Sequence, residues 1–146
     1  MAPSASTRLL LLTLGAAAAT ACTEAEGGAI ELSWKLRALA GALPDDAACA
    51  TADVSAIRLW WQVDDQRAST SWPCPDNRAA TAFVVPPGQA SIWVQPECLT
   101  GLAGEATYEA PPPIVRTIRA GDVTSLDAVV IAVQIADCDN QPCICR

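Results

Sequence analysis

Hydrophobic and polar residues alternate strictly over residues 29–37, and residues 53–65 repeat the pattern, with Ile57, Leu59, Trp61 and Val63 against Arg58, Trp60 and Gln62. A period of two places successive side chains on opposite faces of a β-strand, so each stretch is predicted to be a strand with one buried face and one solvated face. A helix over the second stretch would not place the apolar residues Leu59 and Val63 on its buried face. The side chains expected to point inward are Ile30, Leu32, Trp34 and Leu36, and then Ile57, Leu59, Trp61 and Val63.

The other predicted strands are short and are separated by turn-forming residues. A PPGQ sequence at residues 86–89 predicts a hairpin or a corner between two of them. Seven or so short strands with no convincing amphipathic helix predict an all-β sandwich. We expect it to form a single domain, residues 29–146, that ends in a cysteine-rich tail. The further strand candidates are residues 68–72, 80–85, 90–95, 105–110, 114–118 and 123–135.

The first 21 residues have the order of a secretory signal: one positive charge at Arg8, a leucine-rich run over 9–14, and then small residues. The leucine-rich run is too short to span a bilayer. The sequence ATAC that ends at Cys22 resembles the lipobox of bacterial lipoproteins, although Ala19 stands where leucine is most common. This resemblance implies removal of residues 1–21 and acylation of Cys22. Residues 22–28 are then a short acidic tether. The alternative is an ordinary signal cleaved near Ala21, with Cys22 free or paired between chains.

The chain has seven cysteines, an odd number that leaves one thiol over in an exported protein. If Cys22 carries lipid, six remain and can form three disulfides in an oxidising compartment. Fifteen connectivities are possible. We favour Cys49 with Cys74, which bracket residues 53–72, and a tail tied back to Cys98. Cys143 and Cys145 are expected to reach distant partners. The six disulfide candidates are Cys49, Cys74, Cys98, Cys138, Cys143 and Cys145.

Charge and composition argue against several functions. The formal net charge is −7, and the chain has one lysine and scattered arginines, so nucleic acid is not an expected partner. The absence of histidine removes Ser-His-Asp and Cys-His catalysis and histidine-ligated zinc. The acidic pairs Asp45-Asp46, Asp64-Asp65 and Asp137-x-Asp139 fall in predicted turns, where aspartate is favoured for local backbone bonding. We therefore expect no enzyme and no cofactor.

Five tryptophans in a small domain indicate a further role beyond the core. Trp34 and Trp61 share the apolar parity of their strands and are predicted to be buried. Trp60 and Trp93 have the opposite parity and are predicted to face outward, where indoles can stack on sugar rings or anchor a partner protein. The tail or a proline-rich loop could instead cover them.

The alternating first strand, IRLWWQV, AFVVPPGQASIWVQ and VRTIRAGDVTSLDAVVIAVQ together resemble the prealbumin-like, carboxypeptidase-regulatory-like β-sandwich modules of bacterial surface lipoproteins. The resemblance covers residues 29–135. It implies an immunoglobulin-like sandwich that acts as a spacer, binding surface or stabiliser and has no activity. Thr23 stands where some lipoproteins carry an aspartate for inner-membrane retention, which by the same kind of resemblance favours the outer membrane.

Two functions follow from these patterns. The first is a lipid-anchored envelope protein with a non-catalytic binding or structural role, whose partner is an envelope protein or a glycan. The alternative is a metal-handling envelope protein in which Cys138, Cys143 and Cys145 hold a soft metal as reduced thiolates.

Overall fold

The structure is a computed structural model that describes residues 24–136, 138–139 and 142–145. Strands dominate it, and the only helical segments among these residues are one α-helical turn and two short 3-10 turns. The expected all-β architecture is confirmed. The elements are β1 (Ala29–Ala38), α1 (Ala48–Thr51), β2 (Ala56–Val63), β3 (Gln66–Pro73), η1 (Cys74–Asp76), β4 (Arg78–Ala80), β5 (Gly88–Cys98), β6 (Gly101–Leu102), η2 (Glu105–Thr107), β7 (Tyr108–Glu109), β8 (Ile114–Ile118) and β9 (Val123–Val133).

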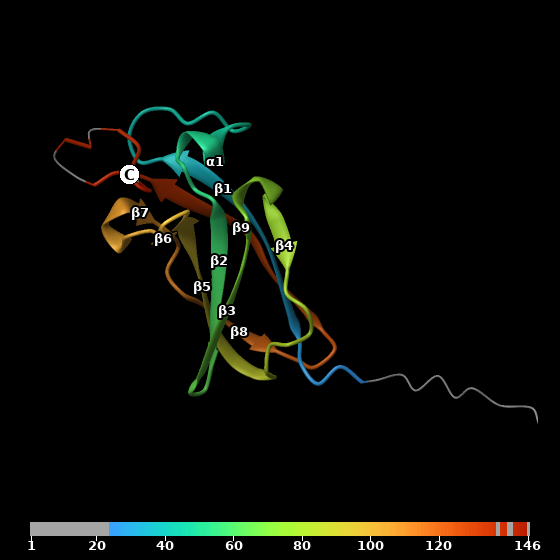
Figure 1. Cartoon of the computed structure of the whole chain (residues 1–146). Coiled ribbons are helices and arrows are strands. Elements are labelled where there is room, and N and C mark those ends of the chain that lie inside the picture. The colour runs from blue at the N-terminus through green and yellow to red at the C-terminus, as the bar shows by residue number, and fades with distance from the viewer. Residues whose placement is uncertain (1–23, 137, 140–141, 146) are drawn as a thin grey trace, which may run out of the picture.

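The strands form two sheets that pack face to face (Figure 1). One sheet has the order β4-β1-β9-β7, in which the first long strand, β1, runs parallel to the last, β9. The other sheet has the order β3-β2-β5-β6, and β8 also pairs with β5. The tail and α1 lie at one end of the sandwich and the start of β1 lies at the other. We call these ends the tail pole and the entry pole.

The core lies between the sheets and follows the alternation in the sequence. On β2 the burial pattern alternates without a break, and Ile57, Leu59, Trp61 and Val63 are all buried. On β1 the inward residues, Trp34 among them, are buried as predicted. Full burial of each large apolar side chain stabilises the fold by roughly 1.5–3 kcal/mol.

The number of strands differs from the prediction. Nine strands occur in the described residues instead of about seven, because β4, β6 and β7 contain only two or three residues each and have no alternation to detect. The strand expected at residues 80–85 is wrong beyond Ala80. The Thr81 amide donates to the Ile30 carbonyl, and the Val84 amide donates to the Ala82 carbonyl. Prolines then lead into β5, so the segment is a corner that crosses from one sheet to the other.

The end of the expected tether is part of the domain. The Gly28 amide donates to the Val85 carbonyl at 2.9 Å, and the Gly121 amide donates to the Gly27 carbonyl at 3.0 Å. A Cβ on Gly27 would lie 2.8 Å from the Phe83 and Val85 carbonyl oxygens. These two glycines are required by close backbone contact, and they fix the chain to the entry pole immediately before β1.

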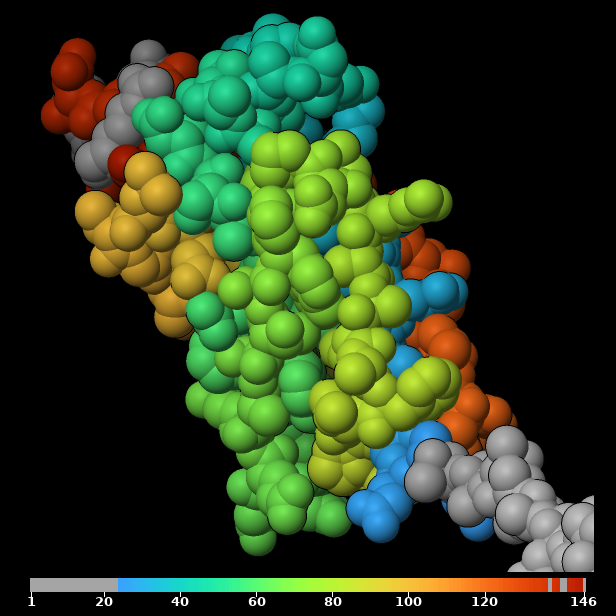
Figure 2. Space-filling model, turned by 45° about the vertical axis from the view of Figure 1, so that its right-hand side comes forward, coloured from blue at the N-terminus to red at the C-terminus, as the bar shows by residue number. Residues whose placement is uncertain are grey.

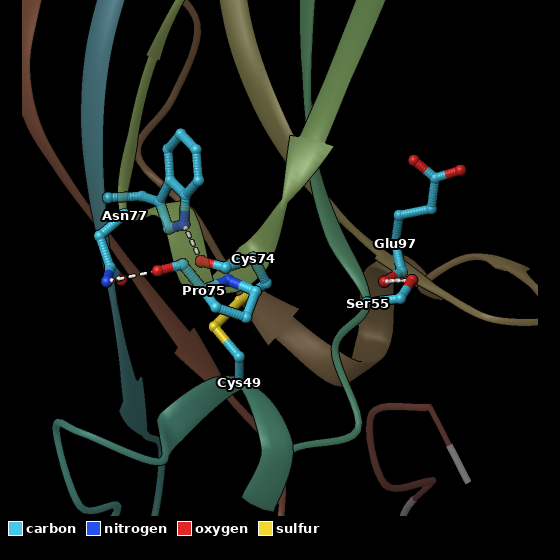
Figure 3. Close-up of a disulfide and its surroundings, with 7 residues drawn as sticks. Cys49, Ser55, Cys74, Pro75, Asn77 and Glu97 are labelled. Carbon is cyan, nitrogen blue, oxygen red and sulfur yellow. Dashed lines mark hydrogen bonds between the residues drawn. A yellow bond between two sulfur atoms is a disulfide. The ribbon is translucent and has the colours of Figure 1, made fainter.

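Three disulfides link the six expected cysteines. Cys49 joins Cys74, and Cys98 joins Cys145. The first is the pairing that the sequence favoured, and the second agrees with the expectation that the tail is tied back to Cys98, for which the sequence did not single out one tail cysteine. Figure 3 shows the first bridge between α1 and the segment after β3. The third bridge joins Cys138 to Cys143 across five positions, so the expectation that Cys143 reaches a distant partner was wrong. The Cα atoms of Cys138 and Cys143 lie 5.2 Å apart, a separation that a disulfide spans.

Candidate functional site

The outer face of the β3-β2-β5 sheet carries a polar and aromatic surface. Residues directly opposite each other in antiparallel strands share a face, and the register places Trp60 opposite both Ser69 of β3 and Trp93 of β5. Amide and hydroxyl side chains surround the two indoles on the same face. We call this surface the tryptophan face, and its members are Arg58, Trp60, Gln62, Arg67, Ser69, Ser71, Ser91, Trp93, Gln95 and Glu97.

Trp60 and Trp93 are stacked on each other. Their ring centroids are 6.0 Å apart and their planes differ by 5°. The Trp60 indole Nε1 donates to the Gln95 Oε1 atom at 3.2 Å. Both indoles are half-buried, although they lie outside the core, because their flanks contact neighbouring strands and side chains. The prediction that both face outward is confirmed, and the arrangement offers a rigid aromatic surface with little rotamer entropy to lose on binding.

Arg67 completes the tryptophan face. Its guanidinium carbon lies 4.9 Å from the Trp93 ring centroid and 5.8 Å from that of Trp60, within cation–π range. Arg67 is exposed, and within the described part of the chain it forms no ion pair. Sequence reasoning missed Arg67 because it falls between the predicted strands 53–65 and 68–72, in what reads as a polar turn. A two-residue turn at Asp64-Asp65 places Arg67 opposite Gln62, and that register is the signal that could have found it.

The second arginine of the tryptophan face is neutralised. Arg58 Nη2 contacts both carboxylate oxygens of Glu97, at 3.0 and 3.1 Å, and its Nη1 donates to Ser69 Oγ. The guanidinium carbon also lies 5.8 Å from the Trp60 centroid. Arg58 therefore supports the indole pair from the side of the tail pole, while Arg67 is the cation that a ligand can reach.

The described residues of the tail, 138–139 and 142–145, do not cover the indoles. The Ile144 amide donates to the Gln134 carbonyl at 2.8 Å, and Cys145 is bonded to Cys98, so the tail packs at its own pole. The proline segment comes closer, since Pro111 and Pro112 line a small hollow together with Trp93. It borders the tryptophan face and leaves both indoles partly exposed.

The other sequence candidates are dispersed. Cys138, Cys143 and Cys145 are all in disulfides, so the cluster has no free thiolate for a metal. Among the described residues no three cysteine, aspartate or glutamate side chains gather as metal ligands. Asp45 forms an exposed ion pair with Lys35 at 2.8 Å. Cys22 and Asp137 lie outside the described residues.

A larger hollow, of about 610 Å³, lies on the outer face of the opposite sheet. It opens where the β1–β9 register shifts between Glu31 and Ser33, and small side chains such as Ala80 and Ala128 leave it wide and shallow. No aromatic side chain of the described residues lines it. The hollow is large because the side chains around it are small. The tryptophan face, with its indoles and arginines, is the better candidate for ligand recognition.

In the described residues no helix combines the length and the apolar character needed to cross a membrane. Comparison with protein-family models, with curated proteins and with solved structures found no match to the chain. The functional assignment therefore depends on the chemistry of the tryptophan face and of the N-terminal sequence.

Proposed function

We propose that the protein is a lipid-anchored, non-catalytic module of the bacterial cell envelope that binds a glycan through the tryptophan face. The observation that carries this proposal is the stack of Trp60 on Trp93 beneath the exposed cation of Arg67. Indoles present flat apolar surfaces that match the faces of sugar rings, and the surrounding glutamine and serine side chains supply hydrogen bonds for hydroxyl groups.

The charge distribution favours an acidic glycan. The whole chain has a formal net charge of −7, which opposes the approach of an anion to most of its surface. On the tryptophan face, Glu97 is already paired with Arg58, and Arg67 has no carboxylate partner among the described residues. Its planar guanidinium can bind a carboxylate or phosphate through two parallel hydrogen bonds. A uronate or phosphorylated sugar stacked on the indoles would provide that anion.

Anchoring through Cys22 and residence in the outer membrane belong to the same proposal. They are supported by the lipobox-like ATAC sequence, by Thr23, and by the three disulfides that use the six remaining cysteines. The narrower assignment of the sandwich to the immunoglobulin-like, prealbumin-like group is also a proposal. It is supported by the two face-to-face sheets and by the parallel pairing of β1 with β9.

The glycan proposal is tested by titrating the protein with uronate-bearing or phosphorylated oligosaccharides and with neutral oligosaccharides of the same length. We expect tryptophan emission to change with the acidic ligands, and we expect Trp60→Ala combined with Trp93→Ala to abolish binding. Trp72→Phe is the matched control, because Trp72 points into the sandwich and its loss should leave affinity unchanged. A double variant that folds and binds normally would refute the proposal. Binding of an envelope protein alone would replace the glycan with a protein partner.

A further inference from the structure

Three exposed apolar side chains gather at the entry pole. Phe83 is 45% exposed, Val84 is 62% exposed and Val123 is 52% exposed. They flank the start of β1 on both sides, because Gly28 pairs with Val85 and Ala29 is opposite Val123. Figure 2 shows the yellow-green segment near residues 80–88 beside the blue start of the chain, at one end of the molecule.

The length of chain between this pole and Cys22 is short. Only Thr23 to Glu26 separate Cys22 from Gly27, whose carbonyl is fixed by the Gly121 amide. Even fully extended, five residue steps reach about 17 Å. A lipid on Cys22 therefore keeps the entry pole close to the bilayer surface, because the headgroup layer takes up roughly 5–7 Å of this reach and leaves about 10 Å beyond it.

We propose that Phe83, Val84 and Val123 form a membrane seat that rests in the bilayer interface and orients the sandwich. This inference rests on the proposed anchor at Cys22. The surface that contacts this seat is a lipid bilayer, because the lipid on Cys22 keeps the bilayer within reach of the entry pole. Apolar contact drives the seating, because the nearby charges give no basic attraction to anionic lipid: they are Glu26, Arg119, Asp122 and the Asp64-Asp65 turn at the same end of the sandwich.

Contact between the membrane seat and the bilayer would fix the direction in which the tryptophan face points. Strand β5 runs eleven residues from Gly88, near the entry pole, to Cys98, at the tail pole. At about 3.3 Å per residue this strand places the far end roughly 33 Å away. With the entry pole in the interface, the strands stand along the membrane normal, and the tryptophan face opens sideways to ligands that lie along the membrane.

The test uses the full lipidated protein in phosphatidylethanolamine vesicles that contain a minority of phosphatidylglycerol and lipids brominated in the upper acyl chain. Val84→Trp adds an indole to the seat. Leu99→Trp adds one at the tail pole, where Leu99 is 94% exposed, and is the matched control. We expect brominated lipid to quench the added emission of Val84→Trp at low and high salt, and to leave that of Leu99→Trp unchanged. Adding Phe83→Ser and Val123→Ser to Val84→Trp should remove the quenching.

Mass spectrometry of the N-terminal peptide separates the two ways in which the inference can fail. An acylated Cys22 with equal quenching at both positions overturns the seat and leaves the anchor standing. Quenching that survives Phe83→Ser and Val123→Ser also overturns the seat, because the tether alone then explains proximity. An unmodified Cys22 overturns the anchor, and the seat falls with it.

Discussion

The protein contains two stacked tryptophan pairs, one inside the sandwich and one outside it. Trp34 and Trp72 lie 6.5 Å apart between their ring centroids, and Trp60 and Trp93 lie 6.0 Å apart. The inner pair is fixed to the backbone, since the Trp34 Nε1 atom donates to the Cys74 carbonyl at 2.8 Å. The outer pair is held by side chains: Gln95 accepts from Trp60, Arg67 lies over both rings, and Arg58 lies over that of Trp60.

This difference separates stability from recognition. Trp34 is 3% exposed and contributes to the core, so its removal leaves a cavity. The outer pair keeps apolar surface in contact with water and adds an unpaired cation, which stabilises the fold little and suits a ligand. Substitutions in the inner pair should therefore mainly lower the unfolding free energy, and substitutions in the outer pair should mainly weaken binding.

The largest effect is expected from Trp34→Ala. It should lower the free energy of unfolding by roughly 3–5 kcal/mol, because a large buried side chain is lost and the Cys74 carbonyl loses its donor. Urea denaturation followed by far-ultraviolet circular dichroism measures it. A loss below about 1 kcal/mol would contradict the structural role of the inner pair.

Removal of the Cys49–Cys74 bridge should have the next largest effect. The double substitution Cys49→Ala and Cys74→Ala opens a link across 25 positions beside the inner pair and should cost roughly 3 kcal/mol. The control is Cys138→Ala with Cys143→Ala, which opens a link of five positions and should cost about 2 kcal/mol or less. Equal midpoints of thermal unfolding for both variants and the parent would refute this prediction.

Loss of the outer pair should affect stability less and binding more. Trp60→Ala with Trp93→Ala removes the stack and the cation–π contacts and should cost roughly 1–2 kcal/mol of unfolding free energy. Binding of an acidic oligosaccharide, measured by isothermal titration calorimetry, should be lost altogether. A stability loss as large as that of Trp34→Ala would mean that the outer pair is structural.

Arg67→Gln should have the smallest effect on stability, below about 0.5 kcal/mol, because the side chain is exposed. The affinity for an acidic oligosaccharide should nevertheless fall about tenfold, as expected for a charge-assisted contact. Affinity for a neutral oligosaccharide should change little. Arg67→Lys retains the charge without the planar guanidinium and should recover part of the affinity.

The parts of this fold that were predictable from sequence are those with a long alternating pattern. Strands β1, β2 and β5 and the outward direction of Trp60 and Trp93 follow from parity alone. Strand β4, only three residues long, is specified by pairing with β1, a long-range contact with no local signal. The packed Gly27 and Gly28 looked like a flexible tether because close backbone approach is invisible in composition.

The candidate site was predictable only where its residues lie on strands with a long alternating pattern. Both indoles were identified by parity, whereas Arg67 required the length of the turn after Val63. That turn sets the register of β3, and a shift by one residue would have moved Arg67 to the inner face. The stacking of Trp34 on Trp72 likewise depends on how the two sheets meet, which the alternation within one strand does not specify.

The most direct test of the tryptophan face uses its indole protons. A ¹⁵N-labelled sample gives one Nε1–H signal for each of the five tryptophans, and single Trp→Phe variants assign them. On titration with an acidic oligosaccharide we predict that the signals of Trp60 and Trp93 shift and that those of Trp34, Trp61 and Trp72 stay in place. Unmoved signals from Trp60 and Trp93 at saturating ligand, or shifts confined to the inner indoles, would contradict the account.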